Sequence, residues 1–169
     1  MEDSESMMDA QNLVAEYGGR LHRFIGHMAG WSEAEDLLQE TFLRVVRSAG
    51  RYREEGKLQS WLFRIADNVC RDHLRASRLR RSMALDESAV DLRSGPLESL
   101  AAREEREAVA AAVRSLTEEQ RRVFLLREEG GMTFREIAEM SGESINTVLG
   151  RMHDALRKMK SILNPTGGK

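Results

Sequence analysis

The fold is decided by residues 31–81, which read WSEAEDLLQETFLRVVRSAGRYREEGKLQSWLFRIADNVCRDHLRASRLRR. Apolar residues recur every three or four positions in two long runs, which predicts two amphipathic helices separated by a short polar loop. Ser32 and Glu35 form a capping-box pattern that predicts a helix start at Glu33, and Gly50 predicts its end. The predicted buried stripe of this helix comprises Leu37, Leu38, Phe42, Val45, Val46 and Ala49.

A strongly basic segment covers the second helix and the loop before it. The helix is predicted from about Gln59 to Arg78, and residues 44–81 contain eleven Lys or Arg against four Asp or Glu, a net charge of +7. Such a cluster is typical of a surface that binds a polyanion. In the loop, Tyr52 lies among cations, which suits stacking with an unpaired base. Trp61 begins the apolar stripe, so it is interpreted as a core anchor rather than a stacking platform. The predicted buried stripe comprises Trp61, Leu62, Ile65, Ala66, Val69 and Leu74.

Charge is segregated along the chain, although the net charge of its 169 residues is only −2. Residues 82–109 hold three Arg against seven acidic residues, a net of −4, whereas the segment from Ser144 onward holds five cations against Asp154. The single cysteine excludes an internal disulfide and favours a reducing compartment. No apolar run reaches the roughly 18–20 residues of a membrane span, and no signal-peptide pattern precedes Ala10, which predicts a cytoplasmic protein without membrane insertion.

Helical periodicity continues on both sides of the central segment and no stretch alternates as a strand would, so the sequence predicts an all-α fold. A helix over Leu13–Met28, after frayed residues 1–9, completes an N-terminal helical domain at residues 10–81. Residues 82–96 lose periodicity and carry acidic residues before a Ser-Gly-Pro sequence, which predicts a flexible acidic linker. A second domain of four helices is predicted at residues 97–163.

The C-terminal domain contains a helix-turn-helix pattern. Thr117 and Thr133 are each followed three positions later by Gln or Glu, so two capping boxes predict helix starts. Residues 141–143 (Ser-Gly-Glu) predict a tight turn, and Ser144 is expected to cap a final helix. A short helix, a turn containing Gly and a longer helix are typical of this DNA-binding motif. The predicted buried face of the final helix comprises Ile145, Val148, Met152, Leu156 and Met159.

These motifs, in this order, resemble the bacterial sigma factors of the extracytoplasmic-function family across nearly the whole chain. The motif AEDLLQETF at 34–42 is similar to the segment with which their sigma-two domain binds the clamp helices of RNA polymerase. The motif WLFRIADN at 61–68, followed by DHLR at 72–75, is similar to their promoter-opening segment. Similarity to their sigma-four helix-turn-helix is carried by EIAE at 136–139, Thr147-Val148 and Arg151.

The resemblance implies an alternative sigma factor that directs core RNA polymerase to promoters and starts transcription by capturing the melted minus-ten strand. The implied polymerase contacts are Asp36, Gln39, Glu40 and Leu43. The implied contacts with the minus-ten element are Tyr52, Arg53, Lys57, Arg64, Asn68, Arg71 and Arg75. The implied contacts of the helix-turn-helix with the minus-thirty-five element are Ser144, Asn146, Thr147, Arg151, His153, Arg157 and Lys158.

The resemblance also implies the partners. They are the beta-prime clamp helices and beta flap of core RNA polymerase, promoter DNA in duplex and single-stranded form, and an anti-sigma factor. The protein would associate with the nucleoid when active, or be held at the membrane by the anti-sigma partner. The acidic linker then has two interpretations, a solvated tether or a strand-like mimic that threads the RNA channel of polymerase.

No enzymatic activity and no cofactor are predicted. The sequence has no Gly-rich phosphate loop, nucleophile elbow or His/Glu metal motif, so catalysis is assigned to the polymerase partner. Cys70 and His73 share a helical face, but two ligands are too few for a metal site.

The final helix departs from the family pattern. Leu149 and Gly150 stand where family members carry a base-reading basic residue and a serine, and Asp154 stands where a cation would face phosphate. Gly150 also destabilises the helix by roughly 0.5–1 kcal/mol relative to Ala. The sequence therefore predicts weak recognition of the minus-thirty-five element, or an unusual element. Two alternatives stay open: a DNA-binding regulator that works without polymerase, and a sigma-like protein that interacts with an anti-sigma factor and has weak promoter activity.

Overall fold

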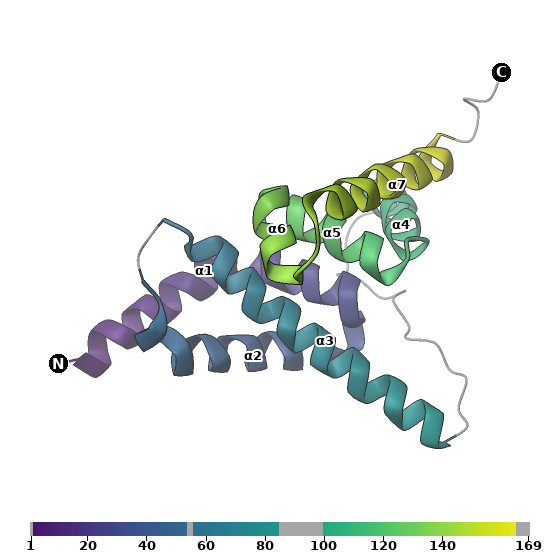
Figure 1. The fold of residues 1–169 in the computed structure, drawn as a ribbon. Coiled ribbons are helices and arrows are strands. Elements are labelled where there is room, and N and C mark those ends of the chain that lie inside the picture. Colours follow the sequence, from purple (N-terminus) through teal and green to yellow (C-terminus); the bar gives the residue numbers. More distant parts are fainter. Residues whose placement is uncertain (1, 54–55, 85–99, 165–169) are drawn as a thin grey trace.

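The computed structural model describes residues 2–53, 56–84 and 100–164. Their regular secondary structure is helical, with no strand among the described residues, so the predicted all-α fold is confirmed. Figure 1 shows α1, α2 and α3 packed together, with the group of α4 to α7 above them. Within the described residues, no helix has both the length and the apolar character of a membrane span. The elements are α1 (Glu2–Ala29), α2 (Trp31–Ser48), the 3-10 turn η1 (Ala49–Arg51), α3 (Leu58–Ala84), α4 (Leu100–Arg114), α5 (Glu118–Glu128), α6 (Phe134–Ser141) and α7 (Ile145–Leu163).

The corner between α1 and α2 differs from the prediction. Helix α2 begins at Trp31 because Gly30 adopts a φ of 106°, which turns the chain into the helix without a side-chain cap. The predicted capping box is therefore wrong, since Ser32 lies inside the first turn. The ring of Trp31 packs against His22 and His27 of α1, at centroid distances of 5.5 and 5.2 Å. This aromatic contact fixes the corner where a polar cap was expected.

The buried stripe of α2 is narrower than predicted. Ala34, Thr41 and Val45 are buried at helical spacing, and the Thr41 hydroxyl donates a hydrogen bond to the Leu37 carbonyl oxygen at 2.7 Å. Val46, placed in the stripe by the sequence, is 53% exposed. Ala49 is exposed as well. One position further along a helix lies about 100° away, which moves Val46 from the core to the surface.

Helices α1 and α3 are both longer than predicted. Helix α1 begins at Glu2, where frayed residues were expected, and α3 runs to Ala84 instead of ending near Arg78. The first residues of the predicted linker, 82–84, are therefore helical. The rest of that linker lies outside the described residues, as do residues 97–99 at the start of the predicted second domain.

The capping signals of the C-terminal half are confirmed. The hydroxyls of Thr117 and Thr133 each accept the backbone N–H three residues on, at 3.2 Å. Gly142 ends α6 with a φ of 69°, and the Ser144 hydroxyl then accepts the Thr147 N–H at 3.1 Å to cap α7. These local interactions produce the expected helix-turn-helix from α6 and α7.

One apolar core runs through both groups of helices. Phe24 of α1 meets the edge of Phe63 of α3 at a centroid distance of 5.5 Å, and both side chains are fully buried. The same cluster continues into Leu126, Ile137 and Val148 of the C-terminal helices. Because α1 also contacts α4 and α5, the described residues form one packed body.

Candidate nucleic-acid interface

One exposed face of α2 gathers three of the four residues predicted to bind polymerase. Asp36, Gln39 and Leu43 follow one another at i, i+3 and i+7, a spacing that puts them on one helical face, and all three are exposed. Val46, the valine that the sequence placed in the core, is exposed at the next turn. The face therefore combines acid, amide and apolar groups, which suits a protein partner.

The fourth predicted residue, Glu40, is already paired. Its carboxylate accepts a hydrogen bond from Nε of Arg44 at 2.7 Å, and Nη1 of Arg44 donates to Asp72 of α3 at 3.0 Å. The hydrogen bonds to Glu40 and Asp72 raise the pKa of Arg44. Glu40 therefore contributes to the packing of α2 against α3 and is only half-exposed to a partner.

A row of exposed side chains follows α3. Arg64, Asn68, Arg71 and Arg75 are separated by four, three and four positions, so they share one face, and all are exposed. Three guanidinium groups and one amide on a single helical face suit a nucleic-acid strand, since cations hold phosphates and an amide can read a base edge.

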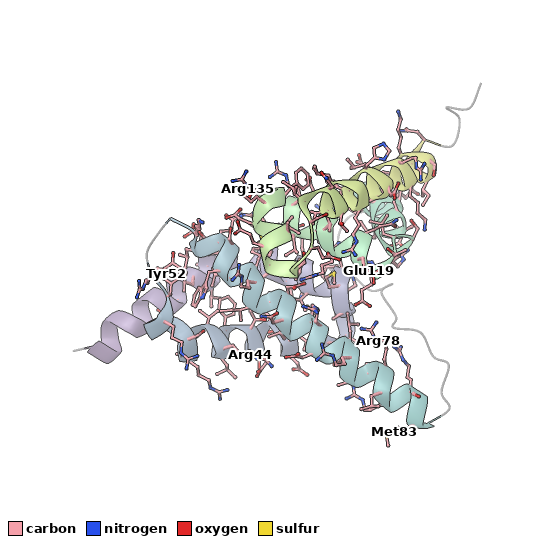
Figure 2. All side chains as sticks on the ribbon, viewed as in Figure 1. Arg44, Tyr52, Arg78, Met83, Glu119 and Arg135 are labelled. Carbon is pink, nitrogen blue, oxygen red and sulfur yellow. The ribbon has the colours of Figure 1, made fainter. Side chains whose placement is uncertain are left out.

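An aromatic pair lies next to the start of this row. The ring of Tyr52 packs against that of Trp61 at a centroid distance of 4.8 Å and an interplanar angle of 38°. Both rings are half-buried. Trp61 is therefore less deeply buried than a core anchor would be, and Tyr52 exposes only part of its ring for stacking with a base. Arg53 and Lys57 of the loop before α3 are exposed. The loop predicted to take a base thus carries Tyr52, labelled in Figure 2, and two exposed cations, and Tyr52 packs against Trp61 of α3.

Some of the predicted DNA contacts of α7 are exposed, and others form hydrogen bonds within the protein. The exposed ones are Asn146, Thr147, His153, Arg157 and Lys158. The hydroxyl of Ser144 is engaged in capping the helix. Arg151 differs more from the prediction. Its two terminal nitrogens donate to the carboxylate of Glu143 at 2.5 and 2.6 Å, and the side chain is half-buried.

Asp154 pairs with two predicted phosphate contacts. Its Oδ1 accepts a hydrogen bond from Nη2 of Arg157 at 3.2 Å and lies 3.7 Å from Nδ1 of His153. The acid therefore reduces the positive charge on this face of α7. Gly150 lies on the exposed side as well, with open space where a Cβ would be.

The predicted buried face of α7 is also wrong in part. Val148, Met152, Ala155 and Met159 are buried against the C-terminal helices. Ile145 and Leu156, which the sequence placed in that face, are exposed, as is Leu149. The buried face of α7 is therefore centred on a line that includes the small residue Ala155, and larger apolar side chains lie at the surface.

A buried ion pair joins the two groups of helices, and the sequence-based prediction missed it. Nε and Nη2 of Arg122 on α5 donate to Oδ1 and Oδ2 of Asp67 on α3 at 2.8 and 2.6 Å. The side chain of Asp67 is 0% exposed and that of Arg122 is 13% exposed. Burial disfavours the charge on Arg122, but the bonds and attraction to Asp67 outweigh burial, and the pKa of Arg122 is raised. The pair satisfies both charges with the parallel geometry that such pairs prefer.

Further polar contacts join the two groups of helices. Nη2 of Arg23 lies 3.0 Å from Oε2 of Glu129, and Nη1 of Arg78 lies 2.9 Å from Oε2 of Glu118. Two hydrogen bonds also join α3 to the C-terminal half: the Ser60 hydroxyl donates to Glu136 at 3.0 Å, and Gln59 Nε2 donates to the Gly130 carbonyl oxygen at 2.5 Å. Burial acts to raise the pKa of Glu136, but hydrogen bonds from Thr133 and Ser60 more than offset it and the pKa is lowered.

A cavity of about 320 Å³ lies beside these contacts, between α3 and the C-terminal helices. Figure 2 labels Arg78 of α3 and Glu119 of α5, two of its lining residues. The lining is dominated by charged side chains: Arg71, Arg75, Arg78, Glu118, Glu119, Arg122, Ser141, Glu143 and Arg151. The cavity therefore joins two members of the basic row on α3 to the helix-turn-helix.

The described residues contain no cluster that resembles a metal centre. Among the described residues, no three His, Cys, Asp or Glu side chains gather as a metal site would require. Cys70 is buried, and burial raises the pKa of its thiol, which makes it an unreactive core residue.

The sequence matches two family models that correspond to the two groups of helices. They are Sigma-70 region 2 over residues 13–80 and Sigma-70, region 4 over residues 106–159. RNA polymerase sigma factor CarQ of Myxococcus xanthus is 33% identical over 160 residues, covering 90% of this chain and 88% of CarQ. The ECF RNA polymerase sigma factor SigK of Mycobacterium ulcerans is 32% identical over 140 residues, covering 80% of this chain and 74% of SigK. The chain belongs to the extracytoplasmic-function family of RNA polymerase sigma factors. The ECF sigma factor BldN of Streptomyces coelicolor is 30% identical over 155 residues, and this sigma factor matches 89% of its own length but only 59% of BldN.

Two solved structures resemble this sigma factor over most of its length. CnrH, solved in complex with the cytosolic domain of CnrY, has a TM-score of 0.67 at 25% identity, with 95% of this chain and 91% of that chain covered. RpoE of Bartonella quintana, solved with the anti-sigma factor NepR, has a TM-score of 0.72 at 21% identity, with 98% and 99% covered. The likeness to RpoE concerns the fold.

Proposed function

We propose that this chain is an alternative sigma factor that recruits core RNA polymerase through α2 and captures the melted minus-ten strand on α3. The observation that carries the proposal is the exposed row of Arg64, Asn68, Arg71 and Arg75 beside the Tyr52–Trp61 pair. Extruding a base from duplex DNA costs a few kcal/mol, which a stacking surface and an amide for the base edge can offset. The three arginines supply salt-sensitive phosphate contacts.

The proposed partners follow from the same surfaces. The clamp helices of the beta-prime subunit would contact Asp36, Gln39 and Leu43, and the beta flap would contact the C-terminal domain. An acidic and amide-bearing face can pair with basic side chains of a partner coiled coil while Leu43 adds apolar contact. An anti-sigma factor is the proposed inhibitor, since both solved relatives named above were determined in complexes, one of them with an anti-sigma factor.

Replacing Asp36 with Arg and Gln39 with Ala tests the recruitment step. We expect wild type to co-elute with sigma-free bacterial core polymerase and the double variant to bind about tenfold more weakly, because one attraction becomes a repulsion. The matched control is Glu16→Arg/Gln11→Ala on exposed α1, which should bind like wild type. If neither wild type nor control binds polymerase, the proposal is wrong and a polymerase-independent regulator is favoured.

The contacts of Asp154 favour the prediction of weak minus-thirty-five recognition. Because this carboxylate pairs with Arg157 and lies near His153, its removal would release positive charge toward DNA. We expect Asp154→Arg to strengthen binding to promoter duplex severalfold and to steepen the logarithmic salt dependence by about one to two units, one for each additional phosphate that the helix neutralises. Fluorescence anisotropy over a salt series measures both. Unchanged affinity and unchanged transcription would show that this face of α7 does not meet DNA.

A further inference from the structure

The first two turns of α7 expose apolar side chains where DNA contacts are predicted. Ile145 and Leu149 are each 42% exposed and lie four positions apart on one helical face. Asn146 is exposed beside them. Figure 1 shows α7 along the side of the C-terminal helices that faces away from α2. In a helix-turn-helix the N-terminal residues of the second helix contact the base edges of the major groove, so these three side chains occupy positions that read sequence.

Gly150 indicates that a partner approaches this side of α7 closely. A glycine inside a helix is destabilising relative to alanine, so it usually has a packing or functional reason. Packing within the protein is not the reason, because no side chain elsewhere among the described residues lies within 4 Å of the place of a Cβ. Gly150 follows Leu149 directly and lies four positions after Asn146, on the same exposed side. Its missing side chain lets the helix backbone come close to a ligand.

The residue types on this side match the edges of a T·A base pair. In the major groove thymine presents its C5 methyl group, and adenine presents an N7 acceptor and an N6 donor. Leu149 and Ile145 can cover methyl groups, while the amide of Asn146 can accept from N6 and donate to N7 of adenine. Against a G·C pair, the same leucine would leave polar groups of the base edge without hydrogen-bond partners.

DNA explains this end of α7 better than a protein partner does. Leu156 is exposed farther along the helix, but Met152 between it and Leu149 is buried, so the apolar surface is interrupted. A partner helix would need a continuous apolar stripe. Exposed cations flank the apolar side chains: Arg135 on α6, labelled in Figure 2, and Lys160 on the side of α7 that carries Leu149. A small apolar patch between cations fits a groove bordered by phosphates.

We propose that the helix-turn-helix of this sigma factor reads thymine methyl groups through Leu149, with Ile145 beside it, and that Gly150 allows the close approach. The inference rests on the proposed function and specifies the upstream element: neighbouring T·A base pairs, in place of the guanine that a basic residue at position 149 would read. Asp154 pairs with Arg157 and weakens the phosphate contacts of the helix, so base contacts carry a larger share of its binding.

Removing single methyl groups from the DNA tests the inference. Holoenzyme assembled from the full chain and core polymerase selects its sites from a duplex library randomised over the length of a promoter. Each thymine in the upstream part of a selected duplex is then replaced by deoxyuridine, which lacks only the 5-methyl group. We expect selected T·A pairs at minus thirty-five, and about fourfold weaker binding when the thymine facing Leu149 loses its methyl group. Leu149→Ala should bind the thymine and deoxyuridine duplexes equally.

Leu156→Ala is the matched control, because it makes the same change at an exposed position farther along α7. It should distinguish thymine from deoxyuridine as wild type does. Wild type without methyl dependence, or Leu149→Ala that keeps it, would overturn the inference and leave the proposed function intact. Equal losses of binding in the two leucine variants, without methyl dependence, would assign this face to a protein partner instead. If wild-type holoenzyme selects no sequence at all, the proposed function is wrong, and the inference with it.

Replacing Gly150 with Ala separates stability from binding. We expect the melting temperature to rise by about 1–4 °C, because alanine favours the helix and its Cβ meets open space. Affinity for the selected duplex should nevertheless fall severalfold, because the Cβ holds the helix away from the DNA. Gly19→Ala on exposed α1 is the control, since its Cβ would make only an ordinary contact with Arg23 at 3.8 Å. It should stabilise the protein without changing affinity, and unchanged affinity in Gly150→Ala would contradict the close approach.

Discussion

Replacing Asp67 with Ala is expected to lower the free energy of unfolding by about 3–5 kcal/mol, because it leaves the buried guanidinium of Arg122 without its partner. For a chain of this size, such a loss lowers the melting temperature by at least about 6 °C. Arg122 can regain water when the two halves separate, so a single unfolding transition is expected to split into two. Differential scanning calorimetry measures both effects.

A surface acid on the same helix provides the matched control. Asp72 is 55% exposed and bonds Arg44 at 3.0 Å, so Asp72→Ala should cost less than about 1 kcal/mol. A double variant, Asp67→Ala/Arg122→Met, is expected to recover part of the loss, because it removes the orphaned charge and keeps apolar volume. Equal effects of Asp67→Ala and Asp72→Ala would show that the buried pair does not hold the halves together.

The helices could be predicted from the sequence because their signals are local. The capping residues Thr117, Thr133 and Ser144 each bond a backbone N–H three positions away, so the pattern and the interaction lie in the same short segment. The predicted start of α2 was wrong for a related reason. The backbone conformation of Gly30 determines where the helix begins. The capping-box pattern at Ser32 and Glu35 predicted a later start, so the role of Gly30 was missed.

The interface between the halves could not be predicted, because its partners are far apart in sequence. Asp67 and Arg122 are separated by 55 positions, and periodicity says nothing about which residue of another helix a side chain meets. One signal was present: Asp67 falls on the apolar stripe between Phe63 and Cys70, and an acid in such a stripe is buried only when it is paired.

In the candidate site, too, the features set by local spacing were predictable and those set by side-chain packing were not. The exposed row from Arg64 to Arg75 follows directly from helical spacing, so its placement was predictable. The pairing of Arg151 with Glu143 and of Asp154 with Arg157 depends on rotamers and on the turn after α6, and it changes which cations DNA could reach. The exposed Ile145 and Leu156 likewise reflect packing that placed Ala155 inward.

Replacing Asn68 with Asp is expected to lower open-complex formation about 100-fold, because a hydrogen-bond donor to a base edge becomes a carboxylate that repels both the base acceptor and nearby phosphates. Asn68 is exposed in the middle of the basic row on α3, so the change should leave folding and polymerase binding intact. Potassium permanganate footprinting of the melted strand measures the effect, with co-elution on core polymerase measured in parallel.

The same chemical change at an unrelated site isolates the role of the amide. Asn12→Asp lies on an exposed position of α1 and adds the same charge, so it should melt promoters as wild type does. If both variants lose activity equally, the effect is one of net charge and the row on α3 does not read a base. If only Asn68→Asp fails while still binding polymerase, the defect lies in strand capture, since recruitment through α2 and melting on α3 then separate in one experiment.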